Sequence, residues 1–115
     1  MPEVNANEEK IGGNITLINF KLEPIEMIVV KKIVGNYVKK ISERAGYKEL
    51  KLRLKQHEHG KGFLNELDAE AIITREREGG ENIVLSSSGQ DYNLFNALAG
   101  VMEKILNEAE GKLKL

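Results

Sequence analysis

The chain has 115 residues, of which 41% are hydrophobic and 30% are charged, and its formal net charge at pH 7 is −1. This length and composition predict one globular domain with a core of its own, and they exclude a chain too polar to fold. Cysteine is absent, which excludes disulfides and thiolate chemistry and is typical of a protein from the reducing cytoplasm. No apolar run approaches the ~20 residues that cross a bilayer. We therefore expect a cytoplasmic protein without a membrane partner.

Residues 1–13 show no hydrophobic periodicity and end in Gly12-Gly13. We therefore predict a disordered N-terminal tail, followed by a single domain over residues 14–115. The aliphatic run within residues 14–22 predicts the first strand. Pro24 then suits the first position of a helix, where its missing N–H is not needed.

An apolar stripe at steps of three and four residues predicts a helix over residues 24–45. Its members are Met27, Val30, Val34, Tyr37, Ile41 and Ala45. Gly46 is expected to end this helix. Most of the lysines in the segment lie off the stripe and are expected on its solvent side.

Two segments then alternate between apolar and polar residues, the pattern of half-buried strands. Within residues 47–57 the leucines point one way and the basic residues the other. Within residues 63–77 the apolar side consists of Leu67, Ala69, Ala71 and Ile73. Gly60 and Gly62 predict the intervening turn, Gly79-Gly80 predicts a second hairpin, and residues 82–87 form the last predicted strand.

A second helix is predicted from a cap at Ser87 or Ser88 to Gly111. Its apolar stripe consists of Phe95, Leu98, Met102, Ile105, Leu106 and Ala109. The order β-α-β-β-β-α predicts an α+β fold, a two-layer sandwich in which two helices cover one face of a four-stranded sheet.

Charge is segregated along the chain, because residues 31–61 carry a net charge of +7 and the remainder carries −8. A concentrated basic surface attracts polyanions, and nucleic acid is the commonest such partner. The candidate nucleic-acid-binding residues are Lys31, Lys32, Lys39, Lys40, Arg44, Lys51, Arg53, Lys55, His57 and Lys61.

The basic residues of the strand have an alternative interpretation. Glu66, Asp68 and Glu70 on the next strand are placed to pair with them across the hairpin, which would neutralise them internally. The chain would then be a protein-interaction domain that forms a homodimer through an exposed sheet face or edge. The sequence leaves both interpretations open.

No pattern of residues indicates catalysis. His57 and His59 are the two histidines, no cysteine accompanies them, and a third metal ligand would have to be a distant acid. Ser86-Ser87-Ser88 lacks the G-x-S-x-G context of a nucleophile, and no phosphate-binding glycine loop occurs. We expect no enzyme, no catalytic residue, no metal and no cofactor, with a metal-dependent enzyme using His57 and His59 as the remaining alternative.

The last third of the chain resembles a known family. Ser88-Gly89-Gln90-Asp91-Tyr92 leads into the second predicted helix, which ends in Gly111-Lys112-Leu113-Lys114-Leu115. This segment resembles the strand-to-helix junction and last helix of the ribosome hibernation-promoting, or ribosome-associated inhibitor, family. The predicted order of elements and the alternating basic strand are also similar to that family.

The resemblance implies a non-enzymatic protein that binds rRNA on the small ribosomal subunit and silences translation by steric occlusion. It implies that the basic residues of the first helix contact rRNA, together with Lys112 and Lys114 at the end of the second helix. The first helix contributes Lys31, Lys32, Lys39, Lys40 and Arg44 to that set.

Overall fold

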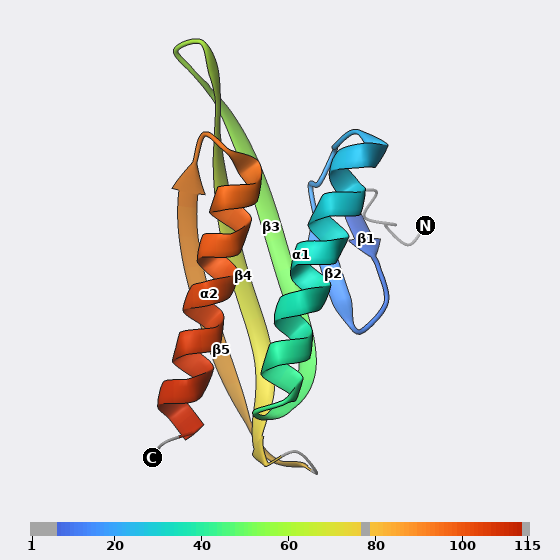
Figure 1. Cartoon of the computed structure of the whole chain (residues 1–115), viewed down its shortest axis with the longest axis vertical. Helices are drawn as coiled ribbons and strands as arrows, with labels where there is room; N and C mark the ends of the chain where they lie inside the picture. The colour runs from blue at the N-terminus through green and yellow to red at the C-terminus, as the bar shows by residue number, and fades with distance from the viewer. Residues whose placement is uncertain (1–6, 77–78, 114–115) are drawn as a thin grey trace, which may run out of the picture.

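The computed structural model describes residues 7–76 and 79–113 of the chain. Two helices cover one face of a five-stranded sheet whose strand order is β1-β2-β3-β4-β5 (Figure 1). The elements are β1 (Glu8–Lys10), β2 (Ile15–Ile18), α1 (Pro24–Ser42), β3 (Gly46–His59), β4 (Gly62–Glu76), β5 (Gly79–Asp91) and α2 (Leu94–Leu113). The α+β class and the two helices on one face are confirmed, whereas the prediction of four strands is wrong by one.

The additional strand, β1, lies within the predicted tail. Gly12 and Gly13 have φ angles of +91° and +60°, which glycine adopts readily. They turn the chain back, so that β1 pairs antiparallel with β2, Glu8 opposite Ile18 and Lys10 opposite Thr16. The tail prediction is therefore wrong for residues 8–10, because the two glycines form a turn, and residues 1–6 lie outside the described residues.

Helix α1 crosses over the sheet and makes β2 and β3 parallel neighbours. It begins at Pro24 as predicted, and the Glu26 carboxylate accepts a hydrogen bond of 3.1 Å from the backbone N–H of Glu23. Val30, Val34 and Ile41 of the predicted stripe are fully buried. The helix ends earlier than predicted, at Ser42, because the chain tightens into a turn there and Gly46 already belongs to β3.

Strands β3 and β4 form a long hairpin, and their inward side chains make the centre of the core. Leu50, Leu52, Leu54, Leu67 and Ile73 are almost completely inaccessible to solvent, as the alternation predicts. The turn between the strands lies at Gly60 and Lys61, where the sequence places it. Gly79 and Gly80, predicted as a turn, already belong to β5.

Strand β5 is longer than predicted and reaches Asp91, so Ser88 lies inside the strand and does not cap α2. The reason is a buried side chain, Asn65 of β4. Its amide nitrogen donates to the carbonyls of Asp91 at 3.2 Å and Tyr92 at 2.9 Å, which fixes the end of β5. The cap of α2 is Asn93, whose side-chain oxygen accepts a hydrogen bond of 3.0 Å from the N–H of Asn96.

Helix α2 packs tightly on β5 at Gly89. A Cβ at this position would lie 3.1 Å from Cγ1 of the buried Val101, so a larger residue would require Val101 to shift by a few tenths of an ångström. The hydroxyl of Ser87 donates to the carbonyl of Val101 at 2.8 Å in the same contact. The helix continues beyond its predicted end at Gly111 to Leu113.

Candidate nucleic-acid interface

The lysines of α1 form the first group of candidate residues. Lys31, Lys32, Lys39 and Lys40 are all exposed, and among the described residues none has a carboxylate within ion-pair distance. The ammonium group of Lys40 lies 5.0 Å from the centre of the Tyr37 ring, which is a cation–π contact. We call these four residues the α1 lysine face.

Arg44, the fifth basic candidate of this segment, is engaged in holding the two helices together. Its Nε lies 2.7 Å from Oε1 of Glu110 on α2, and its guanidinium also donates to the carbonyl of Lys40 at 3.0 Å. About two turns earlier, Tyr37 hydrogen-bonds with Glu103 of α2. Burial raises the pKa of Tyr37, and the hydrogen bond and negative charge of Glu103 raise it further. Arg44 is thus less available to a ligand than the α1 lysine face.

The basic residues of β3 project from the face of the sheet that the helices leave uncovered. The register places each of them directly opposite an acid of β4: Lys51 opposite Glu70, Arg53 opposite Asp68 and Lys55 opposite Glu66. Side chains in such positions lie within reach of each other, their Cβ atoms about 4.5–5.5 Å apart. The register assumed in the alternative interpretation is therefore confirmed.

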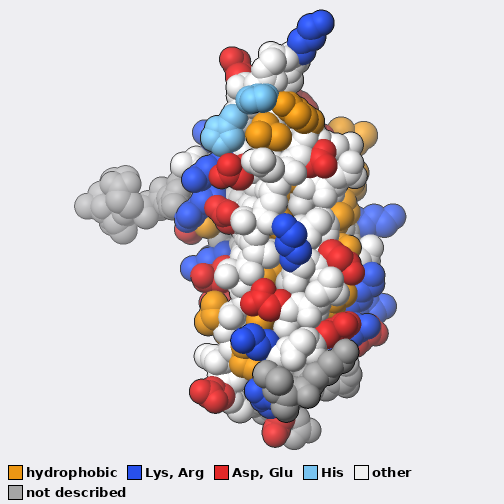
Figure 2. Space-filling model, turned by 90° about the vertical axis from the view of Figure 1, so that its left-hand side faces the viewer, with side chains coloured by type: hydrophobic (Ala, Val, Ile, Leu, Met, Phe, Trp, Pro, Cys, Tyr) orange, Lys and Arg blue, Asp and Glu red, His pale blue; other side chains and the backbone are white. Residues whose placement is uncertain are grey.

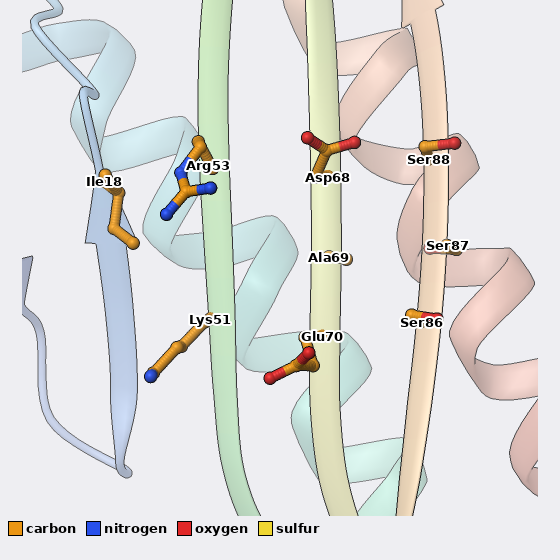
Figure 3. A pocket seen from close by; sticks show the side chains of 9 residues that line it. All are labelled: Ile18, Lys51, Arg53, Asp68, Ala69, Glu70, Ser86, Ser87 and Ser88. Atoms are coloured by element: carbon orange, nitrogen blue, oxygen red, sulfur yellow. The ribbon is translucent and has the colours of Figure 1, made fainter.

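These opposing rows attract each other without closing into tight ion pairs. Within the described part of the chain, one contact of ion-pair length joins the two strands on this face, between His57 Nε2 and Glu66 Oε2 at 3.8 Å. Figure 3 shows that Lys51 and Arg53 lean toward β2, away from the carboxylate of Asp68. Three cations beside three anions leave this face electrically balanced.

The uncovered face contains a shallow depression of about 570 Å³. Lys51 and Arg53 line one side of it, Ser86 and Ser88 line the other, and Asp68 and Glu70 stand between them (Figure 3). A polyanion that reached the two cations would also meet the two carboxylates. This arrangement opposes phosphate binding on the uncovered face.

The ten candidate residues do not form one surface. The α1 lysine face lies on the helical side of the molecule, and Lys51, Arg53, Lys55 and His57 lie on the opposite side of the sheet. Lys61 is in the turn at the far end of the hairpin. The sequence contains a signal for this separation, since the apolar sides of α1 and β3 must both face the core and their polar sides therefore point apart.

The histidines contact residues at the same end of the hairpin. His59 Nδ1 lies 2.5 Å from the hydroxyl of Tyr92, and the two rings are 6.0 Å apart between their centres. Across residues 7–76 and 79–113, no three His, Asp or Glu side chains are grouped so that they could hold a metal ion. The sequence reasoning missed Asn65, whose importance comes from burial that the alternation pattern does not reveal.

In the described part of the chain, no helix is long and apolar enough to cross a membrane. The sequence matches no protein-family model and no curated protein. A solved structure with a similar arrangement is the N-terminal domain of Protein Y from Thermus thermophilus, at 12% identity and a TM-score of 0.48, with 85% of this chain and 92% of that one covered. At this sequence identity and TM-score, the similarity assigns no property of Protein Y to this chain.

Proposed function

We propose that this protein binds structured RNA through the α1 lysine face, without catalysing a reaction. The observation that carries this proposal is the contrast between the two basic groups. The lysines of α1 are exposed and lack ion-pair partners among the described residues, whereas the basic row of β3 lies opposite three carboxylates. Uncompensated cations bind phosphates and release counterions, while compensated ones do not.

The geometry of the face suits a duplex or a folded RNA better than an unstacked strand. Lys32 and Lys39 are separated by seven residues and therefore by about 10 Å along the helix. Lys32 and Lys39 lie on the same side of the helix, with Lys31 and Lys40 to either side of them. Cations held on a rigid helix contact phosphates and require no bases to be splayed out. The sequence resemblance makes rRNA of the small ribosomal subunit the first target to test, with steric occlusion in the cytoplasm as the mode of action.

Two triple variants test the proposal, because each removes three cations and changes the net charge from −1 to −4. K31A/K32A/K39A alters the α1 lysine face, and K51A/R53A/K55A alters the basic row of β3. Binding to small ribosomal subunits is measured by co-sedimentation, and binding to a labelled rRNA hairpin by fluorescence anisotropy. We expect the α1 variant to lose at least tenfold in affinity and the β3 variant to stay within threefold of the wild type.

The salt dependence provides a second measurement. Four phosphate contacts predict a log–log slope of affinity against salt of about −3 to −4 for the wild type. The α1 variant should show a slope close to −1. A flat response of the wild type, or a larger loss in the β3 variant than in the α1 variant, would contradict the proposal.

A further inference from the structure

The two edges of the sheet are built differently. At one edge, β1 has three residues and all three, Glu8, Glu9 and Lys10, are charged. Short, charged edge strands resist pairing with another chain. At the other edge, β5 has thirteen residues and contains no lysine, arginine or proline. Among the described residues no strand pairs with its outer side.

The backbone of β5 is regular over most of its length. Its ladder with β4 runs without interruption from Asn82 to Asp91. Figure 2 shows the side of the molecule formed by β5 and the flank of α2, where backbone and neutral polar groups fill much of the surface and acidic and basic side chains are scattered among them. Val84, next to the midpoint of β5, keeps 58% of its surface exposed. A long, regular edge strand without lysine, arginine or proline is a template for another strand.

We propose that β5 is a homodimer interface, in which the β5 strands of two copies pair antiparallel and join the two sheets into one. A two-fold axis perpendicular to the sheet relates the copies, which keeps all four helices on the same face. The proposal is independent of RNA binding, because the α1 lysine face is not part of this edge.

The sequence of β5 selects the register of this pairing. The strand runs from Gly79 to Asp91, so an axis at Leu85, its midpoint, gives overlap along its full length. In this register Glu81 faces Gly89 of the second copy. An axis one residue further on, at Ser86, would instead place Glu81 opposite Asp91, and like charges opposite each other destabilise a sheet.

The flank of α2 above the edge is compatible with this dimer. Lys104 lies on this flank, since its ammonium group donates to the carbonyl of Ser88 at 2.7 Å. Gly100, Glu108 and Gly111 continue the same row at helical spacing. A Cβ added at either glycine would meet nothing within 4 Å, so the row is low enough for a second α2 to lie beside it.

The helix row and the strand fit the same axis. An axis at the level of residue 106 would pair Lys104 with Glu108 of the second copy. That level is about 7.5 Å along α2 from Val101. Leu85 is about 6.6 Å along β5 from Ser87, which contacts Val101. The step from Val101 to residue 106 and the step from Ser87 to Leu85 both lead toward the end of the sheet that contains Arg75 of β4. The last turn of α2 lies at that end, because Arg75 donates a hydrogen bond to the carbonyl of Lys112.

Charged substitutions at the edge test the proposal. In the proposed register Val84 lies opposite Ser86 of the second copy, and both side chains are exposed on the uncovered face. V84K/S86K and V84E/S86E each place like charges opposite each other, so each should be monomeric. An equimolar mixture should form the heterodimer, because lysine then faces glutamate. N36K/S42K, which adds the same two lysines on α1, is the matched control and should dimerise like the wild type.

Sedimentation equilibrium between 1 and 300 µM measures the association, and circular dichroism verifies that each variant is folded. Hydrogen exchange of the β5 amides in the wild type should slow as its concentration rises. A wild type that is monomeric throughout, or a dimer that survives in both charged variants, would overturn the proposal. So would a mixture that remains monomeric while the separate variants are folded.

Discussion

At the scale of the residue, Tyr47 holds the added strand β1 in place. Its hydroxyl donates to the carbonyls of Gly13 at 2.7 Å and Asn14 at 3.1 Å, which tie the β1–β2 turn to the start of β3. Burial raises the pKa of Tyr47 well above its usual 10, and the negative charge of Glu49 raises it further. The fold therefore favours the neutral phenol over the phenolate.

The raised pKa of Tyr47 predicts how stability depends on pH. Because the folded-state pKa is above the unfolded value, the contribution of Tyr47 is complete below about pH 10 and is lost as pH rises beyond it. Tyr47→Phe should lower the free energy of unfolding by about 1 kcal/mol at pH 7. The difference from wild type should shrink between pH 10 and 11.5, as measured by urea unfolding. A constant difference over that range would show that this phenol does not titrate as described.

At the scale of the element, the start of α2 depends on one cap. Asn93→Ala removes the acceptor for the N–H of Asn96 and should lower the free energy of unfolding by about 1 kcal/mol. Ser88→Ala is the matched control, since Ser88 is exposed within β5 and its carbonyl keeps the bond from Lys104. It should change stability by less than about 0.5 kcal/mol. Urea unfolding of both variants measures the difference, and a larger loss in the serine variant would restore the sequence-based position of the cap.

The error at this cap shows which elements the sequence could predict. The apolar stripes and the alternation of β3 and β4 determined those elements to within a few residues, because burial imposes a period that is visible in the sequence. The stretch Ser86-Ser87-Ser88-Gly89 has no such period. It is a strand because β4 pairs with it and because Asn65, distant in sequence, fixes its end. Long-range contacts of this kind leave no local pattern.

The candidate site was predictable in its parts but not in its arrangement. Each basic group was visible as a run of lysine and arginine, and so were the acids of β4. Which cation faces which acid depends on the register of the hairpin, with His59 opposite Gly62 at its end. A slip of one residue would move every side chain to the other face of the sheet. The tight turn at Gly60 and Lys61 thus decides whether the β3 row is neutralised.

At the scale of the whole molecule, the uncovered face should behave as a balanced array of charge. K51E/R53E/K55E would place six carboxylates on two neighbouring strands, in place of three cross-strand pairs of opposite sign. We expect the free energy of unfolding to fall by about 2 kcal/mol at low ionic strength. Most of the loss should disappear in 1 M salt, where the Debye length is about 3 Å. Urea unfolding at both salt concentrations measures the effect, and an equal loss in each would point to lost packing instead of charge.

The full exchange of the two rows separates the stability of the molecule from its proposed function. K51E/R53E/K55E/E66K/D68K/E70K keeps the net charge at −1 and restores opposite charges at every position of the array. It should recover wild-type stability, because attraction between the rows is symmetric in sign. It should also bind rRNA with wild-type affinity, because the α1 lysine face lies on the other side of the sheet. Anisotropy measurements that show a changed affinity would assign RNA binding to the uncovered face, since this exchange alters that face alone.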